Sequence, residues 1–297
     1  MALIAQRDAF EPDSWPAPVL GFAAELANHD SKEHCHRRAQ LLYSSRGCMT
    51  VTLSDRWLIL PPTRCLWIPG GIRHRVQLHG QVAYRSIYLE PELAPARLQE
   101  CAVLAVNPLL AAVIERIAYW PFNQAIECRA ARDLVPVLIN ELNAARLEST
   151  GLILPRDARL ARWLGNLDKR DELPGLSVLA QELNLHAKTL TRIFQRESGL
   201  SYQQWSQQWR LMRAIELLAE MPRVSTVAQH LGFSSDSAFI AFFRQFTGTT
   251  PKGFMAETSQ GKPAQKPTPA YNAYFPAASA SSASRIPVTA SARLSAR

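Results

Sequence analysis

Three histidines in the first quarter of the chain are the residues whose types and spacing most directly suggest chemistry. His34 and His36 are followed at the same interval by Arg38 and Gln40, and alternate side chains of a strand lie on one face. Imidazoles bind Fe, Zn, Ni or Mn, so a hairpin that brought His74 opposite this face would complete a metal site. The alternative is an empty pocket in which the histidines hydrogen-bond a ligand or one another. Arg38 is either a partner for an anionic effector or a solvated charge at the pocket mouth.

A second group of polar side chains is suited to contact DNA. The helical pattern from Lys188 to Glu197 buries its apolar positions and turns four polar side chains outward: Lys188, Thr191, Arg192 and Gln195. Arginine matches the guanine edge in a bidentate way, and lysine and glutamine reach phosphates or bases. A later helical pattern exposes Ser235, Asp236, Ser237 and Arg244. It is poorer in long donors, and Asp236 is expected to cap the helix or accept from a cytosine amine.

The segments that position these side chains are two copies of one pattern. LSVLAQELNLHAKTLTRIFQRESG ends at Gly199, and VSTVAQHLGFSSDSAFIAFFRQFTG ends at Gly248. Each predicts a helix, a tight turn at Asn184 or Gly232, and a second helix, which is the shape of a DNA-reading helix-turn-helix. Ser177 is the expected N-cap of the first helix. The amphipathic connector between the copies, residues 202–219, predicts a rod of roughly 27 Å, close to the roughly 34 Å between successive major-groove faces of B-DNA.

The N-terminal half has the pattern of a β-rich domain followed by helices. Short β-branched and aromatic pieces (LLYS, CMTVTL, RWLIL, RCLWIP, HRVQLH and AYRSIYL) are separated by turn residues between Cys35 and Leu89, which predicts a small antiparallel barrel. Residues 1–30 carry mixed signals. Helical periodicity then covers residues 107–119 and 129–147. The second of these amphipathic helices packs either on its own barrel or on the same helix of a second subunit.

Composition and charge limit the class of protein. The 297 residues contain no apolar run long enough for a membrane span, and the acidic, proline-containing N-terminus does not resemble a secretory signal. We therefore expect a cytoplasmic protein, with its five cysteines reduced. Residues 1–155 carry 15 basic and 15 acidic side chains, residues 156–257 carry 13 and 10, and residues 258–297 carry 5 and none. The positive excess accompanies the repeat, as an anionic partner requires. Residues 258–297, rich in Ala, Ser and Pro, are expected to be disordered.

The repeat resembles the DNA-binding domain of AraC/XylS-family transcription regulators over about a third of the chain. Its matching motifs are Leu190, Phe194 and Gly199, then Arg210, Ala214 and Leu217-Leu218, then Leu231-Gly232-Phe233, Ser237-Ala238-Phe239, Phe243 and Gly248-Thr249-Thr250-Pro251. The resemblance implies that the first recognition helix makes most base contacts, through Lys188, Thr191 and Arg192. Ala241 stands where some members of the family carry a contacting arginine, which weakens the case for base reading by the second unit.

The N-terminal half resembles the cupins. His34-Cys-His36 with Gln40 and Gly47 is similar to the first cupin motif, and Pro69-Gly70-Gly71-Ile72-Arg73-His74 to the second. The resemblance implies a divalent metal on His34, His36 and His74. Gln40 replaces the usual glutamate and supplies no negative charge, so weaker metal binding is expected.

We therefore expect an α+β protein: a cupin-like effector-sensing and dimerisation domain at 1–150, a linker at 151–155, a double helix-turn-helix domain at 156–257, and a disordered tail. The expected function is transcription regulation without catalysis, with ligand contacts from His34, His36, Arg38, Gln40 and His74. The expected partners are double-stranded DNA, a small-molecule effector, a second copy of the chain and RNA polymerase. The alternatives are a metal-dependent cupin enzyme that carries a DNA-binding domain, and an architectural DNA binder without an effector.

Overall fold

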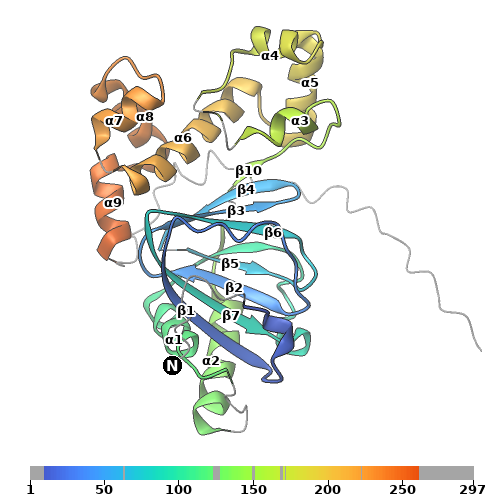
Figure 1. The fold of residues 1–297 in the computed structure, drawn as a ribbon, viewed down its shortest axis with the longest axis vertical. Helices are drawn as coiled ribbons and strands as arrows, with labels where there is room; N and C mark the ends of the chain where they lie inside the picture. Colours follow the sequence, from blue (N-terminus) through green and yellow to red (C-terminus); the bar gives the residue numbers. More distant parts are fainter. Residues whose placement is uncertain are drawn as a thin grey trace, which may run out of the picture.

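The computed structural model describes residues 10–62, 64–122, 128–148, 151–167, 170, 172–221 and 223–260. A strand-rich N-terminal part lies below a helical C-terminal part in Figure 1. The α+β class expected from the sequence is confirmed. Among the helices of the described residues, none combines the length and apolar character needed to cross a membrane.

The N-terminal part consists of two facing antiparallel sheets. The larger has the strand order β1-β7-β2-β5-β8-β9 and the smaller β10-β4-β3-β6. Their bounds are β1 Val19–Ala27, β2 Ala39–Ser44, β3 Cys48–Leu53, β4 Arg56–Leu60, β5 Arg64–Ile68, β6 His74–His79, β7 Gln81–Leu89, β8 Ala102–Ala105, β9 Leu147–Glu148 and β10 Leu152–Ile153. The six strand-like pieces of the sequence correspond to β2 through β7. Strand β1, within the segment of mixed signals, was not predicted.

Alternation along each strand divides its side chains between two cores. Met49, Val51 and Leu58 point between the sheets and pack on Leu42 and Leu66 of the larger sheet. The opposite face of the larger sheet is also apolar. Successive side chains of a strand that is covered on both faces are buried in two different environments. The larger sheet therefore needs a covering layer on its outer face.

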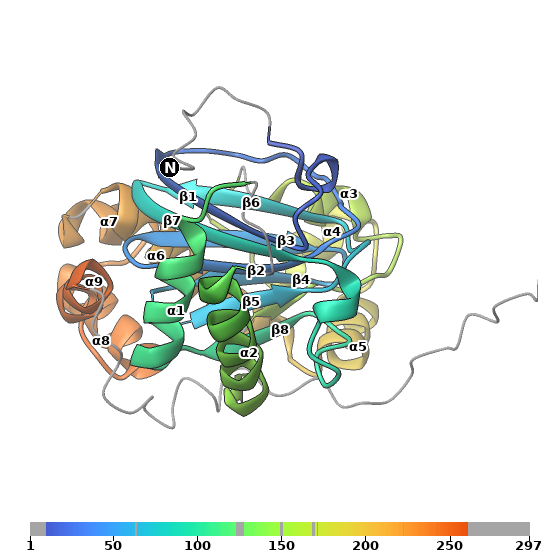
Figure 2. The ribbon, with the colours of Figure 1, turned by 90° about the horizontal axis from the view of Figure 1, so that it is seen from below.

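Helices α1 (Pro108–Ala118) and α2 (Arg129–Ala144) cover the outer face of the larger sheet, as Figure 2 shows from below. Asn107 caps α1 by accepting from Leu110 N, and Pro108 occupies the first turn, where its missing N–H costs nothing. Leu138 and Leu142 of α2 are fully buried, in the same apolar core as the outer face of the larger sheet. The structure thus packs the apolar stripe of α2 on its own barrel.

The C-terminal part is all helical. Its elements are α3 Ala161–Leu164, α4 Leu176–Glu182, α5 Ala187–Ser198, α6 Tyr202–Glu220, α7 Val224–His230, α8 Asp236–Thr247 and α9 Pro251–Gln260. Asn184 and Gly232 have φ of 52° and 67°, so each turns the chain between the two helices of its unit. Gly175, not Ser177, is the N-cap of α4, which corrects that prediction. Helix α9 continues to Gln260, and the rest of the expected tail lies outside the described residues.

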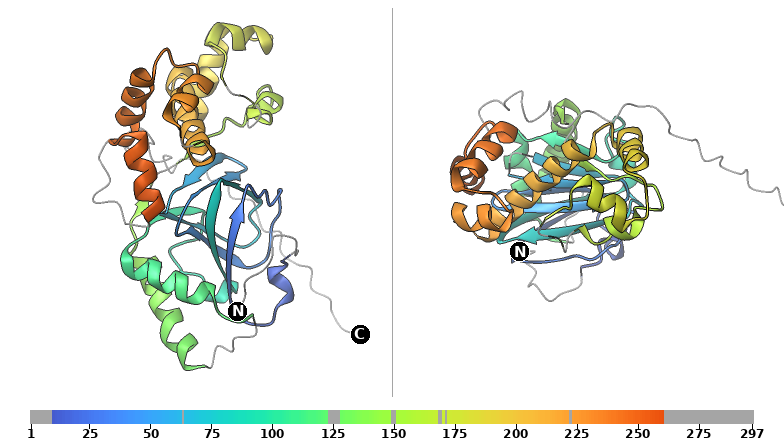
Figure 3. Two further views of the ribbon diagram at one scale, coloured as in Figure 1. Left: turned by 60° about the vertical axis from the view of Figure 1, so that its left-hand side comes forward. Right: turned by 90° about the horizontal axis from the view of Figure 1, so that it is seen from above.

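The connector helix α6 crosses the outer face of the smaller sheet, as the right-hand view of Figure 3 shows. That face carries Cys48, Trp57 and Ile59, which join the same core as Trp205 and Trp209 of α6. Strand β10, within the expected linker, pairs with β4. The Trp205 Nε1 hydrogen bonds to Ile153 O at 2.7 Å. Burial of this apolar face therefore holds the two parts of the chain against each other.

Candidate functional site

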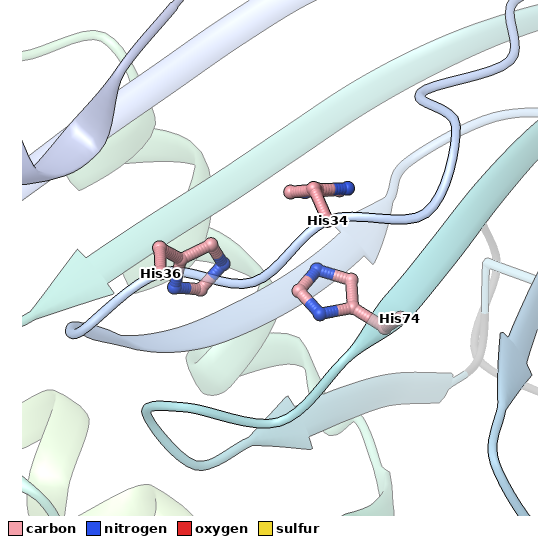
Figure 4. Close-up of side chains that lie close together, drawn as sticks. All are labelled: His34, His36 and His74. Atoms are coloured by element: carbon pink, nitrogen blue, oxygen red, sulfur yellow. The ribbon is translucent and has the colours of Figure 1, made fainter.

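The histidine triad, His34, His36 and His74, is brought together by two segments that are distant in the sequence (Figure 4). His74 begins β6, and its backbone exchanges two hydrogen bonds with that of His34, at 2.9 and 3.0 Å. The ligand atoms of the three rings all lie within 4.8 Å of one another. His36 and His74 are buried and His34 is half-buried. This spacing is compatible with three ligands to one ion.

Backbone carbonyls orient all three imidazoles of the triad in the same way. Each Nδ1 hydrogen bonds to a carbonyl oxygen two residues away: His34 to Lys32 at 3.0 Å, His36 to Arg38 at 2.7 Å, and His74 to Ile72 at 2.9 Å. Because a carbonyl only accepts, Nδ1 carries the proton and Nε2 keeps its lone pair in the neutral ring. Burial lowers the pKa of His74 to about 4, so this ring is neutral at physiological pH. Such carbonyls are typical outer-shell partners of metal-binding histidines.

The inner side of the triad is rich in lone pairs. The Nε2 of His74 is buried and has no hydrogen-bond partner among the described residues. Gln40 Oε1 lies 3.2 Å from the Nε2 of His36, and a neutral His36 with its proton on Nδ1 presents a lone pair to that oxygen. A bound cation would stabilise these converging lone pairs. The repulsion between the Gln40 oxygen and the His36 lone pair is also removed if the Gln40 amide is turned so that its nitrogen faces His36.

A hydroxyl cluster adjoins the triad through Gln40. The Gln40 Nε2, which carries two hydrogens, lies within hydrogen-bond distance of three hydroxyls: Ser86 Oγ at 2.8 Å, Tyr88 OH at 3.2 Å and Tyr84 OH at 3.3 Å. Burial raises the pKa of both tyrosines, so both stay protonated and able to donate. The sequence interpretation missed these three residues, although their alternation along β7 (84, 86, 88) was a usable signal.

Arg38 has a different role from the one expected. It is fully buried, and its guanidinium donates to Ala17 O at 2.7 Å and Trp15 O at 2.6 Å and pairs with Glu90 at 2.7 Å. The expectation of a shared strand face was wrong because β2 begins only at Ala39. Arg38 therefore anchors the N-terminal segment on the barrel, and it is not the solvated charge that was the other expectation.

The first reading helix, α5, presents its polar side chains to solvent. Lys188, Thr191, Arg192 and Gln195 are all exposed, opposite buried Leu190, Ile193 and Phe194. Thr191 Oγ1 donates to Ala187 O and Gln195 Nε2 donates to Gly199 O. Among the described residues, Lys188 and Arg192 form no ion pair, whereas nearby Arg196 is paired with Glu197 at 2.5 Å. The two cations on one face of α5 are therefore available to an anionic partner.

The second reading helix, α8, exposes Ser235, Asp236, Ser237 and Arg244. The Ser235 hydroxyl caps the helix by accepting from Ala238 N at 3.1 Å, so Ser235 and not Asp236 is the N-cap. Phe239, Phe243 and Phe246 fill the buried face. The equivalent position and packing of α5 and α8 on either end of α6 give the chain two helix-turn-helix units on one rod of about 28 Å.

Two family models match the chain. The model described as the AraC-like ligand binding domain matches residues 16–167, and the model described as a helix-turn-helix domain matches residues 179–257. The chain belongs to the AraC/XylS family of transcription regulators. As a member of this family it is a DNA-binding transcription regulator with an N-terminal ligand-binding domain, which confirms the function predicted from the sequence.

Similar proteins carry the same description. The HTH-type transcriptional regulator NimR of Escherichia coli K12 is 28% identical over 266 residues, which are 88% of this chain and 97% of NimR. The HTH-type transcriptional regulator RipA of Corynebacterium diphtheriae is 33% identical over 97 residues, 33% of this chain and 29% of RipA. The crystal structure of the DNA-binding domain of AdpA in complex with a target DNA is 27% identical, covers 34% of this chain and 91% of that chain, and has a TM-score of 0.31.

Proposed function

We propose that a small molecule bound beside the histidine triad sets the operator affinity of this AraC/XylS-family regulator. The triad supplies three imidazole rings whose ligand atoms converge, and the adjoining Gln40 and hydroxyl cluster supply hydrogen-bonding groups. This chemistry suits a ligand that brings a donor atom to a metal and is hydrogen-bonded by Tyr84 or Tyr88. An effector acts on DNA binding only through its differential affinity for two arrangements of the protein.

The triad residues fit a divalent transition metal, which would be held by three Nε2 atoms and would offer an open position to the effector. Two observations carry this proposal: the buried Nε2 of His74 has no partner among the described residues, and the Nε2 of His36 faces an acceptor oxygen. The test is titration of the purified chain with Co²⁺, followed by visible absorption. We expect one ion per chain, lost in His74→Gln and kept in His29→Gln, which changes a histidine outside the triad. No binding by the wild-type chain would contradict the proposal and favour the turned Gln40 amide.

For DNA, we propose that Lys188, Thr191 and Arg192 make most base contacts and that Gln195 adds to them. Their exposure on one face of α5 and the absence of ion pairs on Lys188 and Arg192 within the described residues support this assignment. Ser235, Asp236, Ser237 and Arg244 are proposed to add contacts from α8. The short side chains of α8 favour backbone positioning over base reading. Separate alanine substitutions in α5 and α8, measured against permuted operators, distinguish the two roles.

A second copy of the chain is the proposed partner of the groove between α1 and α2. The groove has a volume of about 710 Å³, and Leu109, Val113 and Tyr119 line it. Leu109 is 51% exposed, and a two-fold interface places the same patch on both subunits. Sedimentation should show a dimer that Leu109→Glu dissociates. An unchanged sedimentation coefficient would place the interface elsewhere.

The triad also supports a second candidate function, a metal-dependent cupin enzyme joined to a DNA-binding domain. Turnover of a substrate by metal-loaded protein would favour it.

We propose a non-catalytic regulator that acts in the cytoplasm and contacts RNA polymerase at its promoters. Its proposed parts are a sensor and dimerisation domain at 1–150, a linker at 151–155 and a DNA-binding domain at 156–257.

A further inference from the structure

A buried carboxylate joins the connector helix to the barrel. Glu216 of α6 is 2% exposed, and its Oε1 accepts a hydrogen bond from Thr50 Oγ1 of β3 at 2.6 Å. His79, the last residue of β6, lies 3.5 Å from the same carboxylate and hydrogen-bonds Glu220 through Nδ1 at 3.0 Å. We call Thr50, His79, Glu216 and Glu220 the clasp. Residues more than 130 positions apart meet here, so the clasp exists only when the two parts are docked.

Removing one partner of the buried Glu216 carboxylate destabilises the protein. A buried carboxylate needs its partners, because an unpaired buried charge is strongly destabilising. Arg213 Nη1 donates to the other oxygen of Glu216 at 2.5 Å. On the barrel side the Thr50 hydroxyl donates to Glu216 and also lies 3.0 Å from His79 Nε2, so Thr50 contacts both Glu216 and His79. The hydrogen bond from His79 also lowers the pKa of Glu220. At the same place Ala219 O approaches Gly80, in the turn after β6, so closely that a side chain at Gly80 would collide with it.

Strand β6 connects the clasp to the histidine triad. Its first residue is His74 of the triad and its last is His79 of the clasp, about 17 Å apart along the strand. The odd spacing turns His74 into the barrel and His79 outward toward α6, in agreement with alternating burial along β6. β6 is the edge strand of its sheet, and among the described residues of that sheet its partner is β3, the strand that carries Thr50. β6 and its pairing with β3 therefore connect His74 to both barrel residues of the clasp.

We propose that β6 transmits the state of the histidine triad to the connector helix, and that the clasp is the contact through which it acts. Because α6 carries a helix-turn-helix unit at each end, a change at Glu216 alters the position of both reading helices relative to the barrel. The proposal rests on the proposed effector response and specifies its route. If the clasp couples the triad to the operator site, removing a contact of the clasp removes the effect of the triad on operator affinity.

The test is a double-mutant cycle on the full chain, with operator affinity measured by fluorescence anisotropy and without any added ligand. His74→Gln perturbs the pocket end. Thr50→Val removes the hydroxyl from the clasp, keeps the shape of the side chain and changes no residue of the DNA-binding part. Thr52→Val is the matched control, since Thr52 lies on the same face of β3 and makes no hydrogen bond to α6 among the described residues. His34→Gln replaces His74→Gln if the latter fails to fold.

We expect the pocket substitution to change the operator Kd by at least about fivefold, the low end of measured couplings. The change should fall below about twofold in the Thr50→Val background and persist in the Thr52→Val background. An equal change in both backgrounds would overturn the proposed route, and so would a pocket substitution without effect on Kd. Titration of the wild-type chain with Zn²⁺, read by operator affinity, tests the proposed pocket function separately.

Discussion

Gly80→Ala is the perturbation that examines the docking of the connector helix most sharply. Gly80 has φ +64°, and a Cβ built there lies 2.4 Å from Ala219 O of α6. Ordinary contact begins at 3.4 Å, so α6 and the turn must separate by 1.0 Å. The neighbouring atom is a helix carbonyl and cannot rotate away. The substitution therefore inserts a wedge between the barrel and the connector.

Two costs add at Gly80, and a second glycine separates them. A left-handed conformation costs an L-residue about 1–2 kcal/mol. Gly71→Ala carries this cost as well, since Gly71 has φ +81°, but its Cβ meets no atom within 4 Å. The two variants should therefore lose similar stability from backbone strain, and Gly80→Ala should lose more through the steric clash with α6.

The assay is hydrogen exchange of the last turn of α6, with thermal unfolding measured in parallel. We expect exchange of the 217–220 amides to accelerate by about tenfold or more in Gly80→Ala, equivalent to about 1.4 kcal/mol of local opening. Gly71→Ala should leave these amides at the wild-type rate. Equal protection of α6 in both variants would refute the conclusion that this contact holds the two parts together.

Three further predictions concern the reading helix, the pocket and acid stability. Arg192→Ala should cost about 1–3 kcal/mol of operator binding and relax the preference at one base pair; weakening that is uniform across sequences would make it a phosphate contact. Gln40→Glu should raise Co²⁺ affinity by about tenfold or more because a carboxylate then faces the triad, and calorimetry showing no gain would argue against a metal there. The Arg75 hydrogen bond holds the pKa of Asp30 below its usual range, so its stabilisation is present above the unfolded pKa and is lost as pH falls below about 4. Asp30→Asn should flatten this acid limb in urea unfolding, and an unchanged limb would exclude this residue as its cause.

The sequence predicted local elements well where periodicity and turn residues agreed. The expected pieces CMTVTL, RWLIL and HRVQLH coincide with β3, β4 and β6, because Ser-Asp and Gly residues bound them. The double helix-turn-helix was predictable since its pattern occurs twice. Strand β1 was missed because VLGFAAELA carries no clear period, and the two-residue strands β9 and β10 are too short for a pattern.

Contacts between residues that are distant in the sequence were harder to predict. Arg38 was misplaced because the alternation rule was extended beyond the start of β2, into a segment that is not a strand. The clasp could not be predicted, since Thr50, His79 and Glu216 meet only through docking of the two parts. Glu216 gave one usable signal, an acid between the apolar residues Ile215 and Leu217 of a long amphipathic helix. Such an acid requires a partner, but the sequence does not identify which one.

The most direct test of the central claim is a hydroxyl-radical footprint of the purified full chain on its operator at physiological salt. Two helix-turn-helix units on one rigid connector should protect two segments on one face of the duplex, centred about 10 base pairs apart. Arg192→Ala should weaken the segment read by α5 more than the other. A single protected turn, or no sequence-specific protection, would contradict the account.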